Sequence, residues 1–436
     1  MLFLLLLGTL WVAGGASHAD VTGQVVTRIG AWLVLVLAIL CGIRPMMSKT
    51  RPVFWLLLAT VLLVLLQLAP LPPSIWTHLP GRELLLSAPF SQEAWRPWSL
   101  APSTTINAAS SLIVPVVTFY LISAMPEEER VWLPAIVLGA IFLSMLIGLL
   151  QFSGFIIDNP FINNSVGSIG GTFANRNHFA LFLAMGCLIA PVWAFTEKQE
   201  AGWRGPVALA LVTLFALTIL ATGSRAGIGT GLLALVIGIA LSWRNIRRAL
   251  PGAPRWVFPV LIAVVIGVIT IFILVSIAAD RAESVRRALE IAPGEDMRGR
   301  ALPTVLSIIA TYFPMGVGFG GFDPIFRLHE PFSLLKPTYF NHAHNDFLEV
   351  VLDGGLPAAL LLLAAIGWYG VASIRAWEGS RRQSVLPGLG SAILLLVFVA
   401  SVFDYPARTP IMMAMIVIAA LWLCQNRTTS IRADFT

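Results

Sequence analysis

Two histidines and three acidic residues stand close together late in the chain, and their types suit acid–base chemistry. The polar residues of this segment are Asn341, His342, His344, Asn345, Asp346, Glu349 and Asp353. A histidine can take a proton near neutral pH, and a neighbouring carboxylate can orient it. The segment therefore indicates a candidate proton acceptor. The alternative interpretation is a helix cap whose histidines are solvated among lipid headgroups.

The same spacing predicts a short helix that positions these side chains. Asn345 is a suitable N-cap, and the three acidic residues then share one helical face. We expect Gly354-Gly355 to end this helix and Pro357 to lie in the first turn of the next one.

Two arginine-bearing segments have the chemistry to hold phosphate. Arg225 fills a very short turn between two long apolar runs, and Arg298 and Arg300 stand at the start of a predicted helix. Arginine offers a permanent charge and paired donors that match phosphate oxygens, and a helix N-terminus also attracts anions. Taken alone, each segment also fits a structural alternative: Arg225 reaching to the membrane interface, and Arg298 on a solvated first turn.

A fourth polar segment, residues 170–178, comes immediately before an apolar run. Its side chains Asn175, Asn177 and His178 are candidates to line a glycan or phosphate site. The alternative is that Asn175 or Asn177 caps the helix that follows.

The composition places all four segments in a membrane protein. Of the 436 residues, 57% are hydrophobic and 11% are charged, whereas a soluble domain carries roughly 25% charged residues. The net charge of +6 is spread between apolar runs, which argues against nucleic-acid binding. The three cysteines have no metal-ligand spacing, and no motif for a metal or a cofactor is present, so we expect neither.

Apolar runs predict twelve membrane-spanning helices. They lie at about residues 2–15, 29–43, 52–69, 105–125, 131–151, 178–196, 205–222, 226–242, 256–279, 356–374, 386–403 and 409–425. The first run ends in Ala16-Ser17-His18-Ala19, as a signal peptide does, but no Lys or Arg precedes it. We therefore expect an uncleaved first helix.

Basic residues orient these helices. One set of alternate loops and the C-terminal tail carry fifteen Lys and Arg residues, and the opposite short loops carry six. The positive-inside rule then places both termini in the cytoplasm and the four polar segments outside. The longest outer loop, residues 280–355, is expected to hold two helices, Asp280–Ile291 and Glu295–Tyr312, and then a glycine-rich turn.

The predicted fold is an all-α polytopic membrane protein with about twelve transmembrane helices. Helices 1–9 occupy residues 1–279, and a helical periplasmic loop between helices 9 and 10 occupies residues 280–355. Helices 10–12 and a cytoplasmic tail occupy residues 356–436.

Five segments resemble motifs of a known family. His344-Asn345, nine further residues and Gly355 are similar to the signature of the bacterial O-antigen ligase and polymerase superfamily. The other similar segments are Gly223-Ser224-Arg225, the Arg298 segment, residues 313–318 and residues 171–178. The resemblance covers roughly residues 165–360 and agrees with a GT-C-like fold. The sequence departs from the family pattern at Ala358, where members often have Gly, Thr or Tyr. This departure weakens the assignment to the ligase branch more than the assignment to the superfamily.

The resemblance implies a metal-independent, inverting transferase of the bacterial inner membrane, with its active site facing the periplasm. It implies that Arg225 and Arg298 bind the diphosphate of an undecaprenyl-diphosphate-linked glycan, and that His344 takes the proton of the acceptor hydroxyl. From their positions we add substrate-binding candidates: His342, Asn345, Asp346, Asn175, Asn177, His178 and Arg300.

The acceptor stays open at this point. A ligase would use lipid A–core and a polymerase a second lipid-linked glycan; we rank the ligase slightly ahead and protein O-glycosylation third. The alternative class is a transporter for lipid-linked sugars, which predicts ionisable residues near the middle of the bilayer. Here the polar residues gather at the outer ends of the runs, and Gln67 is among the few exceptions.

Overall fold

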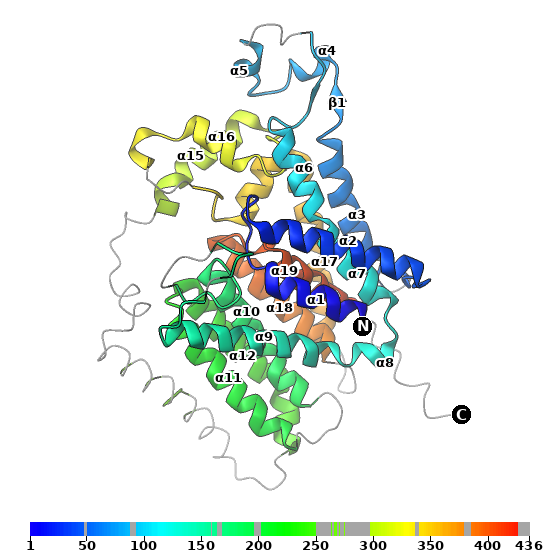
Figure 1. The fold of residues 1–436 in the computed structure, drawn as a ribbon, viewed down its shortest axis with the longest axis vertical. Helices are drawn as coiled ribbons and strands as arrows, with labels where there is room; N and C mark the ends of the chain where they lie inside the picture. Colours follow the sequence, from blue (N-terminus) through cyan, green and yellow to red (C-terminus); the bar gives the residue numbers. More distant parts are fainter. Residues whose placement is uncertain are drawn as a thin grey trace.

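The computed structural model describes residues 1–47, 50–87, 93–157, 159–163, 168–195, 202–249, 263, 266, 267, 270, 274, 297–335, 340–378 and 385–425. Within these residues the regular elements are helices, apart from two short paired strands (Figure 1). The strands are β1 (Pro70–Leu71) and β2 (Arg96–Pro97), which pair antiparallel. The predicted all-α membrane fold is therefore confirmed.

Eight helical segments of the described chain are long and apolar enough to cross a membrane, and three apolar helices are shorter. The helices concerned are α1 (Leu2–Ala13), α2 (Thr22–Leu40), α3 (Arg51–Leu66), α6 (Pro102–Ser111), α7 (Ile113–Ala124), α8 (Glu127–Arg130), α9 (Leu133–Phe152), α10 (Arg176–Ala194), α11 (Arg204–Ala221), α12 (Arg225–Ala249), α17 (Asp346–Glu378), α18 (Leu386–Phe403) and α19 (Pro410–Leu423). The segments α6–α7 and α8–α9 each form one span. Together the segments correspond to the predicted spans except 256–279, which lies largely outside the described residues, as does the predicted helix 280–291.

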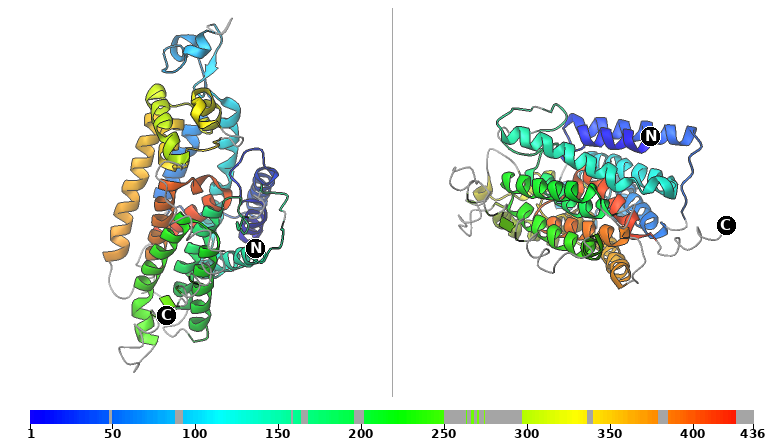
Figure 2. Two further views of the ribbon diagram at one scale, coloured as in Figure 1. Left: turned by 90° about the vertical axis from the view of Figure 1, so that its left-hand side faces the viewer. Right: turned by 90° about the horizontal axis from the view of Figure 1, so that it is seen from below.

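Helix α10 lies at the centre of the membrane part. It packs against α9, α11, α12 and α18, and the green helices α10, α11 and α12 run side by side in both views of Figure 2. Phe179, Phe182 and Leu183 are completely buried along it. Because protein rather than lipid surrounds α10, the polar residues at its N-terminus are held in a fixed position.

Smaller elements gather at one end of the molecule. Helices α4 (Pro73–Trp76) and α5 (Glu83–Leu86) form a lobe with the two strands, at the top of Figure 1. Beside it lie α15 (Met297–Tyr312), α16 (Phe322–His329) and the 3-10 helix η1 (Phe332–Leu334), which share a second apolar core. Helix α15 confirms the helix predicted from Glu295 to Tyr312. The last short element is the 3-10 helix η2 (Pro406–Arg408).

A break in α17 separates its polar first turns from its long apolar part. Gly355 has φ +59° and ψ −147°, so the helix is interrupted at the position where the sequence predicts its end. The Leu356 N–H donates to the carbonyl of Pro314 at 2.7 Å. A Cβ at Gly355 would lie 2.1 Å from that carbonyl oxygen, so only glycine fits.

Gln67 joins the outer elements to the membrane helices. Its side chain is fully buried; it donates to the Asp353 carbonyl at 3.1 Å and accepts from the Phe319 N–H at 2.9 Å. The glycine-rich turn around Phe319 is thereby fixed to the end of α3 and to the part of α17 just before its break. This intramembrane polar residue therefore has a structural role.

Candidate active site

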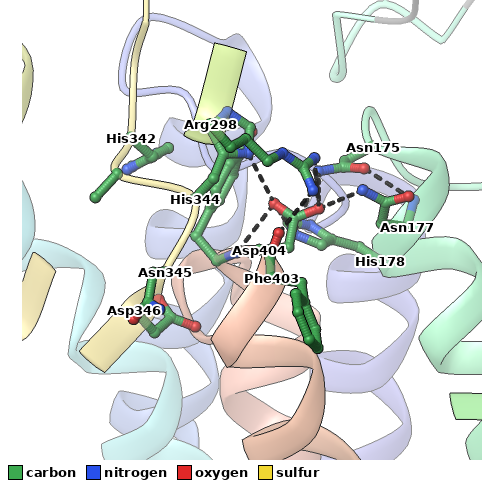
Figure 3. Close-up of polar contacts among 12 residues, drawn as sticks. Asn175, Asn177, His178, Arg298, His342, His344, Asn345, Asp346, Phe403 and Asp404 are labelled. Carbon is green, nitrogen blue, oxygen red and sulfur yellow. Dashed lines mark hydrogen bonds and ion pairs between the residues drawn. The ribbon is translucent and has the colours of Figure 1, made fainter. Parts of the chain in front are cut away.

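Three of the four polar segments meet at one carboxylate, Asp404, in the turn between α18 and α19 (Figure 3). Asp404 is 1% exposed. Its Oδ1 lies 3.3 Å from Nδ1 of His344, and its Oδ2 lies 3.7 Å from Nη2 of Arg298. The side-chain amides of Asn175 (3.1 Å) and Asn177 also donate to Oδ2. The structure thus brings together four of the residues predicted to form the site.

The surroundings keep Asp404 ionised. Burial alone would raise the pKa of its carboxyl, but the hydrogen bond with His344 and the nearby His178 and Arg298 outweigh burial. The pKa of Asp404 therefore lies well below its usual range. A fixed buried anion in this position can orient a histidine and stabilise its protonated form.

His344 has a strained backbone. Its φ is +50°, and it is the one non-glycine residue with positive φ in the part of the chain that the structure describes. Such a conformation costs on the order of 1–3 kcal/mol and persists only where neighbouring contacts enforce it. The imidazole packs beside Tyr405 and Phe340, with ring centroids 4.9 and 5.0 Å away.

The geometry of His344 suits a base. When its Nδ1–H donates to Asp404, Nε2 carries the lone pair that accepts a proton. The side chain is 18% exposed, so the imidazole is not sealed from a substrate. His344 can therefore take a proton from a hydroxyl that reaches the cluster.

Arg225 borders the cluster as the first residue of α12, and its side chain is exposed. The preceding Ser224 donates from Oγ to Oδ1 of Asn177 at 2.7 Å and accepts from the Gly227 N–H at 2.8 Å. Asn177 in turn contacts Asp404. A chain of two hydrogen bonds thus links the start of α12 to Asp404, and this helix end favours an anion beside Arg225.

Asn175 caps α10, as the alternative interpretation of the 170–178 segment predicts, and it also contacts Asp404. Its Oδ1 accepts from the Asn177 N–H at 2.8 Å and caps α10, while its amide nitrogen donates to Asp404. His178 is buried behind the cluster, with Nδ1 3.0 Å from Oγ1 of Thr409 and Nε2 3.8 Å from Asp404. This histidine is a packed member of the cluster rather than an accessible one.

The remaining predicted residues lie outside the Asp404 cluster. Asn345 caps the short helix, as predicted: its Oδ1 accepts from the Leu348 N–H at 3.0 Å. Its amide donates to the Val402 carbonyl at 3.0 Å. Arg300 is exposed and donates to the Ser333 carbonyl at 2.7 Å. His342 and Asp346 lie apart from Asp404 (Figure 3).

The predicted acidic face exists, but it faces the protein interior. Asp346, Glu349 and Asp353 are buried and surround Arg408, whose nitrogens lie 3.7, 3.3 and 3.2 Å from their respective carboxylate oxygens. Burial alone would lower the pKa of Arg408, but these carboxylates raise it above its usual value. Ser401 also donates to Asp346 at 2.8 Å. Asp346 is therefore part of a buried ion cluster, and substrate binding by it stays a prediction.

The sequence reasoning missed the turn 404–408, which supplies Asp404, Tyr405 and Arg408. One signal was available: an aspartate and an arginine stand together in a turn only a few residues long between two strongly apolar runs. Charged residues so close to the membrane generally have partners in the protein.

Within the described ranges, no three His, Cys, Asp or Glu side chains converge as metal ligands would. Metal independence stays a prediction.

Two comparisons with known proteins bear on the family of this chain. Residues 208–363 match the protein family described as O-antigen ligase, and this range contains Arg225, Arg298 and His344. This match supports the resemblance to the O-antigen ligase and polymerase superfamily that the sequence motifs show. A curated protein similar to this chain is the exopolysaccharide production protein ExoQ of Rhizobium meliloti (strain 1021). It is 25% identical over 317 residues, which cover 69% of this chain and 68% of the relative.

The part of the chain that matches the family model supplies the two arginines and the histidine. Asp404 lies beyond the matched range, although it holds Arg298 and His344 together. The superfamily deals with lipid-linked polysaccharides at a membrane, and the multi-pass fold fits such substrates.

Proposed function

We propose that this protein transfers a glycan from undecaprenyl diphosphate to an acceptor hydroxyl, at the periplasmic face of the bacterial inner membrane. One observation carries the proposal: Arg298 and His344 converge on Asp404, and Arg225 stands next to the same cluster. A diphosphate donor needs fixed cations and an acceptor hydroxyl needs a base. The cluster offers both at one end of a bundle of apolar helices.

In the proposed reaction, the acceptor oxygen attacks the anomeric carbon of the donor glycan from the side opposite the diphosphate. A new glycosidic bond forms, and the bond from the anomeric carbon to the diphosphate oxygen breaks with inversion. Nε2 of His344 takes the hydroxyl proton, and Asp404 stabilises the resulting imidazolium. Arg225 and Arg298 stabilise the negative charge on the departing lipid diphosphate.

The sidedness of the site follows from two arguments. The starts of α10 and α12, the start of α15 and the turn 404–408 are joined by hydrogen bonds and ion pairs, so they lie on the same side of the membrane. The distribution of basic residues assigns that side to the periplasm. A lipid diphosphate in the outer leaflet would present its charged group at this depth.

For the acceptor we favour a second lipid-linked glycan, which makes the protein an exopolysaccharide polymerase. The supporting observation is the relative named for exopolysaccharide production, because its match extends over 69% of the chain. The description of the family supports lipid A–core, the acceptor of an O-antigen ligase, as the second candidate. This order reverses the slight preference drawn from the sequence.

Glycan analysis of a deletion strain tests both the function and the acceptor. Single repeat units on the lipid carrier, in place of long chains, are expected for a polymerase. Long chains stranded on the carrier, together with bare lipid A–core, would instead indicate a ligase. Unchanged surface and lipid-linked glycans would overturn the proposed function.

A further inference from the structure

A second histidine–carboxylate pair lies beside the first. Both oxygens of Glu349 contact the residues just before His344: Oε1 lies 2.8 Å from Nδ1 of His342, and Oε2 accepts from the Ala343 N–H at 2.8 Å. Glu349 is 1% exposed. Its carboxylate therefore clamps one side chain and one backbone N–H of the loop that carries His344.

This clamp acts on a strained segment. His344 has a left-handed backbone with φ +50°, which non-glycine residues adopt only where their surroundings enforce it. On the C-terminal side, Asn345 is fixed as the cap of α17 and by its contact with the Val402 carbonyl. On the N-terminal side, the contacts of Glu349 with His342 and Ala343 fix the backbone in the same way.

Glu349 is itself tied to the turn that holds the other half of the site. Nη1 of Arg408 lies 3.3 Å from Oε1 of Glu349, and Arg408 belongs to the same turn as Asp404. Tyr405, between these two residues, packs against the rings of both His342 (4.2 Å) and His344 (4.9 Å). The turn 404–408 thus contacts the histidine loop through Asp404 and, independently, through Arg408 and Glu349.

We infer that Glu349 is a positioning residue for glycan transfer: through His342 and Ala343 it holds the left-handed backbone of His344 that places the imidazole against Asp404. The inference rests on the proposed function. It assigns Glu349 no contact with either substrate. Loss of the clamp therefore lowers the rate of the chemical step and leaves binding of the donor diphosphate unchanged.

The chain offers a matched control in Asp353, which lies on the same helical face and is 0% exposed. It too pairs with Arg408, at 3.2 Å. Its side chain also accepts from the Gly320 N–H at 3.1 Å, in the glycine-rich turn and not in the histidine loop. Glu349→Gln and Asp353→Asn each replace one carboxyl group beside the same arginine by an amide, but only Glu349→Gln changes contacts with the histidine loop.

The test compares purified full-length wild type, E349Q and D353N in lipid nanodiscs, with a lipid-diphosphate-linked glycan as donor. Transfer rates are measured against donor concentration, and the folded fraction is measured by thermal unfolding. For E349Q we expect kcat to fall by about tenfold or more while the donor KM changes by less than about twofold. For D353N at the same folded fraction, we expect kcat within about threefold of wild type.

Equal losses of kcat in E349Q and D353N would overturn the inference, because Glu349 would then act only through the stability of the Arg408 cluster. If E349Q does not fold, His342→Ala removes one of the two contacts of Glu349 with the histidine loop, at a partly exposed position. A fall in kcat at constant KM supports positioning, whereas unchanged kcat or a raised KM contradicts it. Absence of transfer by the wild type would contradict the proposed function and is thereby distinguishable.

Discussion

Replacing Asp404 by asparagine removes the negative charge that the other residues of the site contact, without changing the size of the side chain. Oδ2 accepts hydrogen bonds from Asn175 and Asn177 and forms an ion pair with Arg298. Oδ1 contacts His344 and accepts from the Tyr405 N–H. An asparagine has one acceptor oxygen, so its NH2 group must face one of these two sets of donors. Either orientation leaves buried donors unsatisfied.

The size of the effect follows from these contacts. A hydrogen bond to a charged group contributes about 1.5–3 kcal/mol, and an unsatisfied buried partner adds to the loss, so we expect D404N to be less stable by about 2–4 kcal/mol. The orientation of His344 is lost as well. Because a positioned general base contributes about 10²- to 10⁴-fold in rate, we expect kcat to fall by that order.

The assay is transfer by the purified protein in nanodiscs, with thermal unfolding measured on the same samples. Asp323→Asn is the control, because Asp323 forms an exposed ion pair with Arg327 at 2.7 Å. Such surface pairs contribute about 0–1 kcal/mol, so this variant should resemble the wild type. A D404N protein with near wild-type kcat would refute the role assigned to Asp404.

The pH dependence of this stability difference has a definite sign. Folding lowers the pKa of Asp404, so its stabilisation is fully present above the unfolded pKa of about 3.9 and is lost as pH falls towards the folded pKa. The difference between wild type and D404N should therefore persist from about pH 7 to 5 and shrink below about pH 4. A difference that disappears between pH 7 and 5 would contradict this reasoning.

Four further predictions concern other parts of the account. Arg298→Ala and Arg225→Ala should each lower kcat/KM for the lipid-linked donor by about 10²-fold or more, as measured in initial-rate assays; unchanged kcat/KM would remove that arginine from the diphosphate site. Arg408→Met leaves three buried carboxylates without their cation, so denaturant unfolding should show a loss of about 3–5 kcal/mol, and an unshifted midpoint would argue against the ion cluster. Gly355→Ala should be strongly destabilising because its Cβ would lie 2.1 Å from a backbone oxygen, whereas Gly367→Ala, with open space around it, should not; equal melting temperatures would count against the break in α17. Chelation by EDTA should leave transfer unchanged because arginines supply the positive charge; activity lost to EDTA and restored by Mg²⁺ would contradict metal independence.

Local patterns in the sequence predicted the elements well. The apolar runs identified the membrane helices, since burial in lipid requires long uninterrupted stretches of such residues. Asn345 and Gly355 gave the start and the break of the helix that follows the histidines, because caps and positive φ have strong residue preferences. Helix α2 begins at Thr22 rather than near residue 29 because Gln24 and Arg28 find polar partners, Gln24 with Ala16 and Arg28 with Asn107.

Local patterns in the sequence did not reveal which residues pair in the tertiary structure. The spacing of Asp346, Glu349 and Asp353 predicted a shared face, but it did not reveal that Arg408, 55 residues beyond Asp353, neutralises that face from inside. Asp404 likewise follows its partner His344 by 60 residues and has no motif around it. The resemblance to a family supplied Arg225, Arg298 and His344, yet the carboxylate that joins two of them became visible only in the fold.

The most direct test of the central claim is single-turnover transfer by His344→Ala, with the lipid-linked glycan donor and acceptor in nanodiscs. The account predicts that the variant binds the donor and melts like the wild type but forms product about 10²- to 10⁴-fold more slowly. A His344→Ala protein that forms product at the wild-type rate would show that His344 is not the base.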